Sequence, residues 1–337
     1  MKKIVTLGEI PLRLSTNVGE RLFQTNQLTM HYGGAEANVS ASLASFGCDV
    51  YFVSKVPDNP LGKGAEKHLK SNGVHTDYLF KGGERLGTYY LEAGVGERSA
   101  QVLYDRKYSS FSKLTWEEID FDEIFHHATL FHITGITPAL SPNLNELTLV
   151  SLKKAKEKGV ITSFDFNYRS KLWSLQEAAE AIKLFLPYVD ICSCGELDAV
   201  YLFDIEKADD VLDKEQKLTY YYKKIQEMYP NIKHISSTFR DVISASNNTL
   251  QGNYFTEGVL YQSKVHHIDQ IVDRVGAGDA FAAGILYGII EEMDSQQTVS
   301  FATAGSALKH TVHGDCNVFT KDEVMAFVQN ESGKIIR

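Results

Sequence analysis

Residues 275–281, with the sequence Val-Gly-Ala-Gly-Asp-Ala-Phe, combine residue types that could bind an anion and remove a proton. Residues 280–290 are almost wholly apolar and predict a buried helix. Backbone N–H groups at a helix start have no partner within the helix, and the helix dipole is positive there. Small residues let a phosphate approach these groups closely. We therefore expect Gly276, Ala277 and Gly278 to form an anion-binding site, called the anion cradle below.

Asp279 directly follows the anion cradle. A carboxylate repels phosphate, but it is suited to accepting the proton of a hydroxyl group that attacks phosphorus. The pattern thus indicates phosphoryl transfer to an alcohol. A simpler interpretation is an ordinary loop followed by a capping aspartate, because short Gly-x-Gly runs also occur without function.

The composition excludes several classes of protein. At 337 residues, the chain can build one large α/β domain or a core with a smaller appendage. Its net charge of −9 argues against broad binding to nucleic acid or anionic membranes. No apolar run is long enough to span a bilayer, and Gly8-Glu9 interrupts the first apolar run too early for a secretory signal. We expect a cytoplasmic protein.

The four cysteines are scattered along the chain. Cys192 and Cys194 lack the two-residue spacer of zinc and redox motifs, and no second pair accompanies them. They are therefore interpreted as buried thiols near a strand end, with neither a disulfide nor a structural metal expected.

From about residue 111 onward, apolar runs alternate with helical patterns. The predicted strands are residues 130–133, 161–164, 189–192 and 234–237, and the predicted helices are residues 143–158, 175–186 and 219–228. This alternation predicts an α/β fold with a mainly parallel sheet and helices on both faces. Ligands bind at the carboxyl ends of such strands. Polar clusters follow those ends at residues 167–169, 193–198 and 238–240.

Two segments, about 10–32 and 86–110, show alternating patterns without helices. Residues 94–96 fit a hairpin turn between two strands. We expect a small β-sheet lid, inserted in a single domain of residues 1–337, that keeps water from a phosphoryl donor. Because such a sheet would leave one apolar face uncovered, we expect a homo-oligomer, with dimerisation through the lid as the hypothesis.

A second glycine-bearing segment, residues 33–47, also leads into a helix rich in small residues. Asn38 is polar on an otherwise apolar face, so it either bonds to the backbone of the turn or contacts a ligand.

The Gly-Gly-x-x-x-Asn segment at residues 33–38 and the Gly-Ala-Gly-Asp segment at residues 276–279 resemble the two signatures of the ribokinase-like (PfkB) family of carbohydrate kinases. Their spacing and the strand–helix alternation extend the resemblance over nearly the whole chain. The resemblance implies a ribokinase-like fold, ATP as phosphoryl donor, Mg²⁺, and Asp279 as the base.

Residues 104–107, 132–140 and 165–173 resemble the 2-keto-3-deoxygluconate kinase branch of that family. This resemblance implies transfer of the ATP γ-phosphate to the terminal hydroxyl of that sugar acid. The residues implied in sugar-acid binding are Gly34, Ala35, Asn38, Tyr90, Tyr104, Arg106, Ile136, Arg169 and Asp315. Arginine offers a planar two-pronged donor for a carboxylate. The alternatives are a solvated lid charge for Arg106 and an internal ion pair with Asp165 or Asp198 for Arg169.

The same resemblance implies a nucleotide site on the other side of the anion cradle. Its residues are Asn167, Ser193, Ser236, Thr238, Arg240, Gly276 and Gly278, with Thr303, Ala304 and Ala307 bordering the base.

The sequence departs from the family pattern at two positions. Gly195 stands where many relatives have the Asn of Asn-x-x-Glu, so only Asp198 remains there to act on Mg²⁺ through water. Arg274 stands where relatives have a small or hydroxyl residue, and it either adds positive charge near the phosphates or points to solvent.

Three other functions were considered. A kinase of a neutral sugar such as fructose or ribose would give Arg106 and Arg169 no anion to bind. A non-catalytic sugar-acid sensor would not need Asp279. A dinucleotide-dependent oxidoreductase would carry a Gly-x-Gly-x-x-Gly fingerprint after the first strand, which this sequence lacks. P-loop and protein-kinase signatures are also missing from it.

Overall fold

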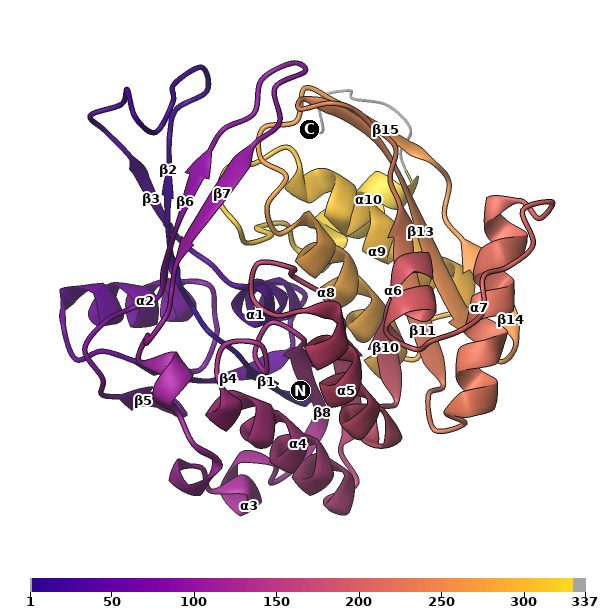
Figure 1. Ribbon diagram of the computed structural model, residues 1–337, viewed down its shortest axis with the longest axis horizontal. Helices are drawn as coiled ribbons and strands as arrows, with labels where there is room; N and C mark the ends of the chain where they lie inside the picture. Colours follow the sequence, from indigo (N-terminus) through magenta and orange to yellow (C-terminus); the bar gives the residue numbers. More distant parts are fainter. Residues whose placement is uncertain (1, 330–337) are drawn as a thin grey trace.

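The computed structural model describes residues 2–329, which form two β-sheets and the helices that cover the larger one (Figure 1). The larger sheet has eleven strands in the order β12-β13-β11-β10-β9-β8-β1-β4-β5, with β14 and β15 also paired to β13. All neighbours from β11 to β5 are parallel. These strands are β1 (Lys3–Leu7), β4 (Asp49–Val56), β5 (Leu79–Lys81), β8 (Ala128–Thr134), β9 (Ile161–Asp165), β10 (Ile191–Ser193) and β11 (His234–Phe239).

An antiparallel extension follows β11 at one edge of this sheet. It consists of β12 (Val242–Ser244), β13 (Asn247–Thr256), β14 (Val259–Gln262) and β15 (His266–Asp269). The sequence analysis did not predict these strands, because their alternation is short and rich in polar residues. Of these strands, β13 and β14 contact α9; β13 can be followed beside it in Figure 1.

Both faces of the parallel strands are covered by apolar packing. Val5 and Phe131 pack into one cluster, whereas their neighbours Ile4 and Leu130 pack into the other. Successive side chains of a strand point to opposite faces, so continuous apolar runs such as these mark a sheet buried on both sides.

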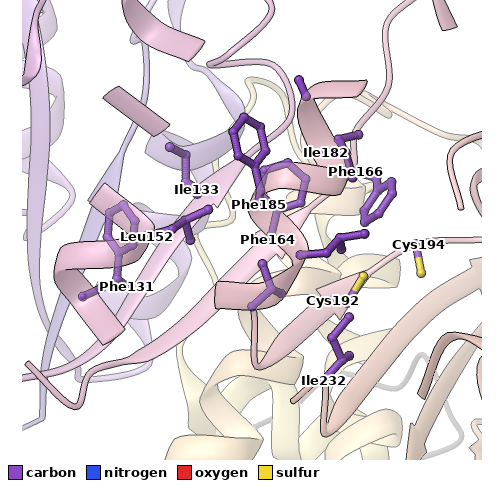
Figure 2. Packing of buried hydrophobic residues seen from close by; sticks show 14 of the residues in the cluster. Phe131, Ile133, Leu152, Phe164, Phe166, Ile182, Phe185, Cys192, Cys194 and Ile232 are labelled. Atoms are coloured by element: carbon purple, nitrogen blue, oxygen red, sulfur yellow. The ribbon is translucent and has the colours of Figure 1, made fainter. Parts of the chain in front are cut away.

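The first face is covered by α3 (Phe121–Ile124), α4 (Pro142–Glu157), α5 (Leu175–Phe185), α6 (Glu196–Tyr201) and α7 (Lys214–Met228), with the 3₁₀ turns Phe111–Lys113, Trp116–Glu118 and Leu186–Tyr188. The second is covered by α1 (Ala35–Ser45), α2 (Pro60–Ser71), α8 (Ala277–Ile290), α9 (Ser295–Lys309) and α10 (Lys321–Gln329). Figure 2 shows the first cluster, in which Phe164 and Phe166 pack beside Cys192 and Cys194. Both thiols are buried, as the sequence predicted.

The second sheet, called the small sheet below, has four strands in the order β3-β2-β6-β7. They are β2 (Leu12–Ser15), β3 (Thr29–Tyr32), β6 (Thr88–Glu92) and β7 (Gln101–Asp105), and they fall within the two alternating segments of the sequence. β2 and β6 are parallel, and the other neighbours are antiparallel. In Figure 1 the small sheet projects from the core at the upper left.

The register of the small sheet determines its two faces. Met30, Leu14, Tyr90 and Leu103 lie opposite one another in one row across the four strands. The adjacent row is His31, Arg13, Tyr89 and Tyr104, on the other face. One face of the small sheet is therefore apolar in its central row, and the other is polar.

The predicted mainly parallel sheet with helices on both faces is confirmed. Within residues 2–329, no helix is long and apolar enough to cross a membrane.

Candidate active site

The anion cradle lies at the start of α8, whose side chains are mostly buried. Gly276 precedes the helix with φ at 80°, a conformation that favours glycine. A Cβ atom at Gly276 would overlap the carbonyl oxygen of Asp315. By contrast, a Cβ atom at Gly278 would meet no heavy atom within 4 Å, so this position faces open space. The helix start is thus firmly packed on one side and accessible to an anion on the other.

Asp279 lies in the first turn of α8 and accepts a hydrogen bond of 2.7 Å from Nδ2 of Asn38. The amide oxygen of Asn38 accepts hydrogen bonds from Gly34 N (3.3 Å) and Cys316 Sγ (3.4 Å). These bonds orient the amide so that its NH₂ group faces Asp279. The structure therefore brings the two glycine-bearing segments together. Burial raises the pKa of Asp279 to about 6, and the Asn38 bond opposes this rise.

Two further carboxylates lie close by: Asp165 ends β9 beside Asp279, and Asp198, in the first turn of α6 after β10, lies beside Asp165. Burial and the charge of Asp279 raise the pKa of Asp165 to about 8, and burial also raises the pKa of Asp198. The positive charge of Arg169 opposes the rise at all three carboxylates. The site thus gathers three carboxyl groups near one arginine, and a bound cation would favour their ionised forms. The sequence analysis did not identify Asp165 as part of this group.

A magnesium ion fits this group only with waters in its coordination shell. In the described part of the chain, no three His, Cys, Asp or Glu side chains are close enough to hold a metal together. Oδ2 of Asp198 already accepts a hydrogen bond of 2.8 Å from Gly195 N, and Gly195 offers no side chain to a metal or its waters. Mg²⁺ commonly keeps several waters and uses one or two carboxylates.

Arg106 is only 9% exposed and forms an ion pair with Glu9, which follows β1. Nε and Nη2 of Arg106 approach Glu9 Oε2 at 2.7 and 2.5 Å. The guanidinium also lies 5.9 Å from the ring centre of Tyr104. The alternative of a solvated charge is therefore wrong for Arg106. Glu9 was not identified from the sequence.

Arg169 is exposed, and its Nη1 donates to the carbonyl oxygens of Asn167 (3.2 Å) and Tyr168 (3.1 Å). Among the residues that the structure describes, it makes no ion pair with Asp165 or Asp198. The guanidinium is thus accessible to an anion in solution.

The prediction that Tyr90 and Tyr104 line the same pocket is wrong. Tyr104 pairs with Tyr89 across β6 and β7, and their ring centres are 6.3 Å apart. Tyr90 pairs with Leu103 and points to the opposite face of the small sheet. Tyr89 is therefore the tyrosine of β6 that shares a face with Tyr104.

Asp315 was predicted to contact substrate hydroxyls, but its carboxylate is occupied by protein. It is 2% exposed, with Oδ1 2.7 Å from Nη1 of Arg13 and Oδ2 accepting a 2.5 Å hydrogen bond from Tyr89. Its position in a buried ion pair contradicts direct contact with a sugar in this structure.

The remaining sugar-site positions lie beside these groups. Gly34 caps α1, where a Cβ atom would overlap the carbonyl oxygen of Glu9. Ala35 is the first residue of α1, and Ile136 is half-buried in the loop after β8. That loop is held by Glu36, which accepts hydrogen bonds from Thr134 and Thr137.

The predicted nucleotide residues divide into two groups. Four of them lie at or near the carboxyl ends of β9, β10 and β11: Asn167, Ser193, Thr238 and Arg240. The fifth strand-end candidate, Ser236, lies in the middle of β11 and is buried, so its predicted contact with the nucleotide is not supported. The buried helix α9 carries Thr303, Ala304 and Ala307.

The positions on α9 are packed inside the protein. Thr303 and Ala304 are 0% exposed; Thr303 donates to Val299 O, and Ala304 packs in the second core cluster. Ala307 packs against Leu250. The prediction that these three residues border the base is therefore not supported, because α9 turns them toward the core.

Arg274 is half-buried, and its Nη2 donates to the carbonyl oxygens of Ser244 (3.2 Å) and Ala245 (2.7 Å). It therefore ties the segment before the anion cradle to the turn after β12, and it does not simply point to solvent.

The sequence model of the pfkB family carbohydrate kinases matches residues 1–322. The chain belongs to this family. The 2-dehydro-3-deoxygalactonokinase of Haloferax volcanii is 33% identical over 96% of this chain and 95% of its own length. The 2-dehydro-3-deoxygluconokinase of Bacillus subtilis is 29% identical over 96% of this chain and 94% of its own length.

A solved structure of 2-dehydro-3-deoxygluconokinase from Thermotoga maritima is also similar. It is 41% identical, with a TM-score of 0.94, and the match covers 98% of this pfkB-family chain and 100% of that one. Family membership and this likeness confirm the predicted ribokinase-like fold and the carbohydrate-kinase class.

The two glycines of the anion cradle make a matched pair for a stability test. We expect Gly276→Ala to lower the free energy of unfolding by at least about 1 kcal/mol, because a side chain is disfavoured at positive φ and would overlap Asp315. Gly278→Ala should change it by less than about 0.5 kcal/mol. Urea unfolding of both variants gives the comparison. Equal stability of the two variants would contradict this assignment of roles.

Proposed function

We propose that the protein transfers the γ-phosphate of ATP to the terminal hydroxyl of 2-keto-3-deoxygluconate. The observation that carries the proposal is the placement of Asp279 beside the anion cradle, with its carboxylate oriented by Asn38. The similarity to kinases of 2-keto-3-deoxy sugar acids supports the substrate class. One of these relatives is named a 2-dehydro-3-deoxygalactonokinase and two are named 2-dehydro-3-deoxygluconokinases. Both keto-deoxy sugar acids therefore belong in the tests.

In this mechanism Asp279 accepts the proton of the attacking hydroxyl. Its pKa is raised to about 6, which makes it a stronger base than an ordinary aspartate. Because this value is still below neutral pH, Asp279 is mostly ionised there. The N–H groups of the anion cradle face the transferred phosphoryl group and stabilise its charge. Most of the acceleration comes from holding hydroxyl, base and phosphate in line.

Asp198 and Asp165 are the residues that would hold Mg²⁺, through water. When bound, this ion supplies positive charge to the phosphate oxygens of ATP. Burial raises the pKa of both carboxyl groups, and a bound cation would favour their ionised forms, which supports the assignment.

The sugar-acid carboxylate is assigned to Nη1 of Arg106 and to Arg169. Both guanidiniums lie beside the carboxyl ends of the strands, one from the small sheet and one from the core. The Glu9 ion pair already neutralises much of the charge of Arg106, and this observation favours the second candidate, a kinase of a neutral sugar such as fructose or ribose.

We assign the small sheet the role of a lid and of a dimer contact. Its polar face, with Tyr89 and Tyr104, packs toward the active-site loops, as the bond from Tyr89 to Asp315 requires. Its apolar row includes Met30 and Leu103, which are 52% and 60% exposed. An exposed apolar row on a small sheet fits association with a second copy of the chain.

Turnover should depend on the ionised carboxylate of Asp279. We expect Asp279→Asn to lose about 10²–10⁴-fold in kcat while retaining its fold and ATP binding. In the wild type, kcat/KM should fall as the pH drops through about 6, because protonation removes the base. Turnover of the variant within threefold of wild type, by coupled ADP release, would remove Asp279 from the mechanism.

The substrate is tested with coupled ADP release on 2-keto-3-deoxygluconate, 2-keto-3-deoxygalactonate, fructose and ribose. We expect turnover on the keto acids only, and a large rise in their KM in Arg169→Met, because the carboxylate loses a cationic partner. Lys183→Met is the control, because Lys183 lies in the last turn of α5, away from the carboxyl ends of the strands. Turnover on a neutral sugar alone would support the kinase activity but contradict the proposed sugar-acid substrate.

Dimerisation is tested by sedimentation. A lysine at Leu103 would place a charge in the apolar row of the small sheet, so Leu103→Lys should shift the protein toward monomer. Val211→Lys replaces an even more exposed apolar side chain outside this sheet and should leave the mass unchanged. A wild-type protein that sediments as a monomer at working concentration would refute the dimer.

A further inference from the structure

Four buried charged groups lie between the small sheet and the loops on either side of the anion cradle. They are Arg13 on β2, Asp273 just before the cradle, Lys309 at the end of α9, and Asp315 in the loop that follows. Each is less than a tenth exposed. We call them the charge cluster. The reaction described above assigns no role to Arg13, Asp273 or Lys309.

Arg13 connects the two carboxylates of the charge cluster. Its Nη2 lies 2.5 Å from Asp273 Oδ2, and its Nη1 lies 2.7 Å from Asp315 Oδ1. Tyr89, on the strand next to Arg13, donates to the other oxygen of Asp315. Two neighbouring strands of the small sheet therefore hold the loop of Asp315, and Arg13 also holds the segment of Asp273.

The core side of the charge cluster is built from the loops that shape the cradle. Asp273 accepts hydrogen bonds of 3.1 Å from Val275 N and from Gly314 N, so its carboxylate joins the segment before the cradle to the loop after α9. Lys309 Nζ donates to Asp273 O (3.2 Å) and Val312 O (3.4 Å).

The carbonyl oxygen of Asp315 packs directly on Gly276, where a Cβ atom would overlap it. The position of the first cradle residue thus depends on the loop that Arg13 holds.

The charges of the cluster balance only while Arg13 is present. Arg13 and Lys309 carry two positive charges, and Asp273 and Asp315 carry two negative ones. Removing one member of a buried ion pair leaves its partner charge uncompensated, which is strongly unfavourable. Without Arg13, the two carboxylates would repel each other or draw in water, and the loops that support the cradle would separate.

We propose that Arg13 is a positioning residue that fixes the geometry of the anion cradle and links it to the small sheet. Arg13 contacts neither substrate. Its guanidinium determines where the cradle N–H groups point, and the small sheet carries that guanidinium into place. The link to turnover rests on the proposed kinase function, whereas the link to nucleotide binding does not require the sugar to be identified.

The test compares Arg13→Met and Arg13→Lys with Arg98→Met. Arg98 is a more exposed arginine of the same sheet region; it pairs with Glu92, and within residues 2–329 no ion pair joins it to the cradle loops. In Arg13→Met we expect kcat to fall roughly 10- to 100-fold, because small displacements of positioning groups have effects of this size. The affinity for ATP should fall as well, and the KM for the sugar should change much less. Arg98→Met should keep wild-type values.

Arg13→Lys keeps the charge but not the two-pronged geometry, so it should fall between wild type and Arg13→Met. If Arg13→Met does not fold, Arg13→Lys takes its place in the comparison with wild type. The double variant Arg13→Met/Asp315→Asn restores the charge balance; we expect it to recover thermal stability without recovering kcat. Full recovery of kcat in the double variant would show that Arg13 only balances charge, and would overturn the proposal.

Calorimetric titration with ATP and Mg²⁺ separates this inference from the choice of substrate. If the wild type turns over none of the sugars, the proposed function fails, and weaker ATP binding in Arg13→Met still supports the positioning role. Wild-type kcat and wild-type ATP affinity in a folded Arg13→Met would overturn it.

Discussion

The hydrogen bond between Asn38 and Asp279 joins residues 241 positions apart, and the active site depends on it. A carboxylate beside a phosphate-binding helix start must resist two tendencies. Burial favours its protonated form, and its ionised form repels the ligand. The amide of Asn38, held by Gly34 N and Cys316, supplies a fixed donor that favours the ionised form. The packing of α1 on α8 places the two residues together.

Ion pairs connect the polar face of the small sheet to the core, alongside the apolar packing of Leu12 in the second core cluster. Arg106 reaches Glu9, and Arg13 reaches Asp273 and Asp315. These ion pairs follow from the position of the sheet, because a face that turns toward a polar ligand cannot also be an apolar packing surface. Buried pairs are sensitive to geometry, since their attraction compensates for lost hydration only when contacts are close. They therefore favour one placement of the sheet.

The sequence predicted the parts of the site that depend on local patterns. The helix start at residues 276–279, the glycine segment at residues 33–38 and the parallel strands are all readable from spacing and periodicity. The sequence did not reveal whether Tyr89 or Tyr90 faces the site, because adjacent residues of one strand point to opposite faces and only the register decides which face is which. A partner across the sheet fixes that register, and the pairing of Tyr89 with Tyr104 provides it.

The charge pairs were beyond the reach of sequence reasoning for a different reason. Arg13 and Asp273 are 260 positions apart, and neither lies in a recognisable motif. The burial of Thr303 and Ala304 was equally hidden, because small residues on a helix suit both a ligand surface and close packing against another helix. Here α9 packs against α8, where a Cβ atom at Gly284 would overlap Ala302.

The carboxylates of the site also set the charge state of the base. Asp165 interacts with both Asp198 and Asp279, and Arg169 opposes the raised pKa values of all three carboxylates. A cation held by Asp165 and Asp198 would favour the ionised forms of these two residues. The phosphate oxygens of ATP carry net negative charge even with Mg²⁺ bound, and they would favour the protonated form of Asp279. The hydrogen bond from Asn38 and the charge of Arg169 therefore have to keep Asp279 ionised while the phosphoryl donor is in place.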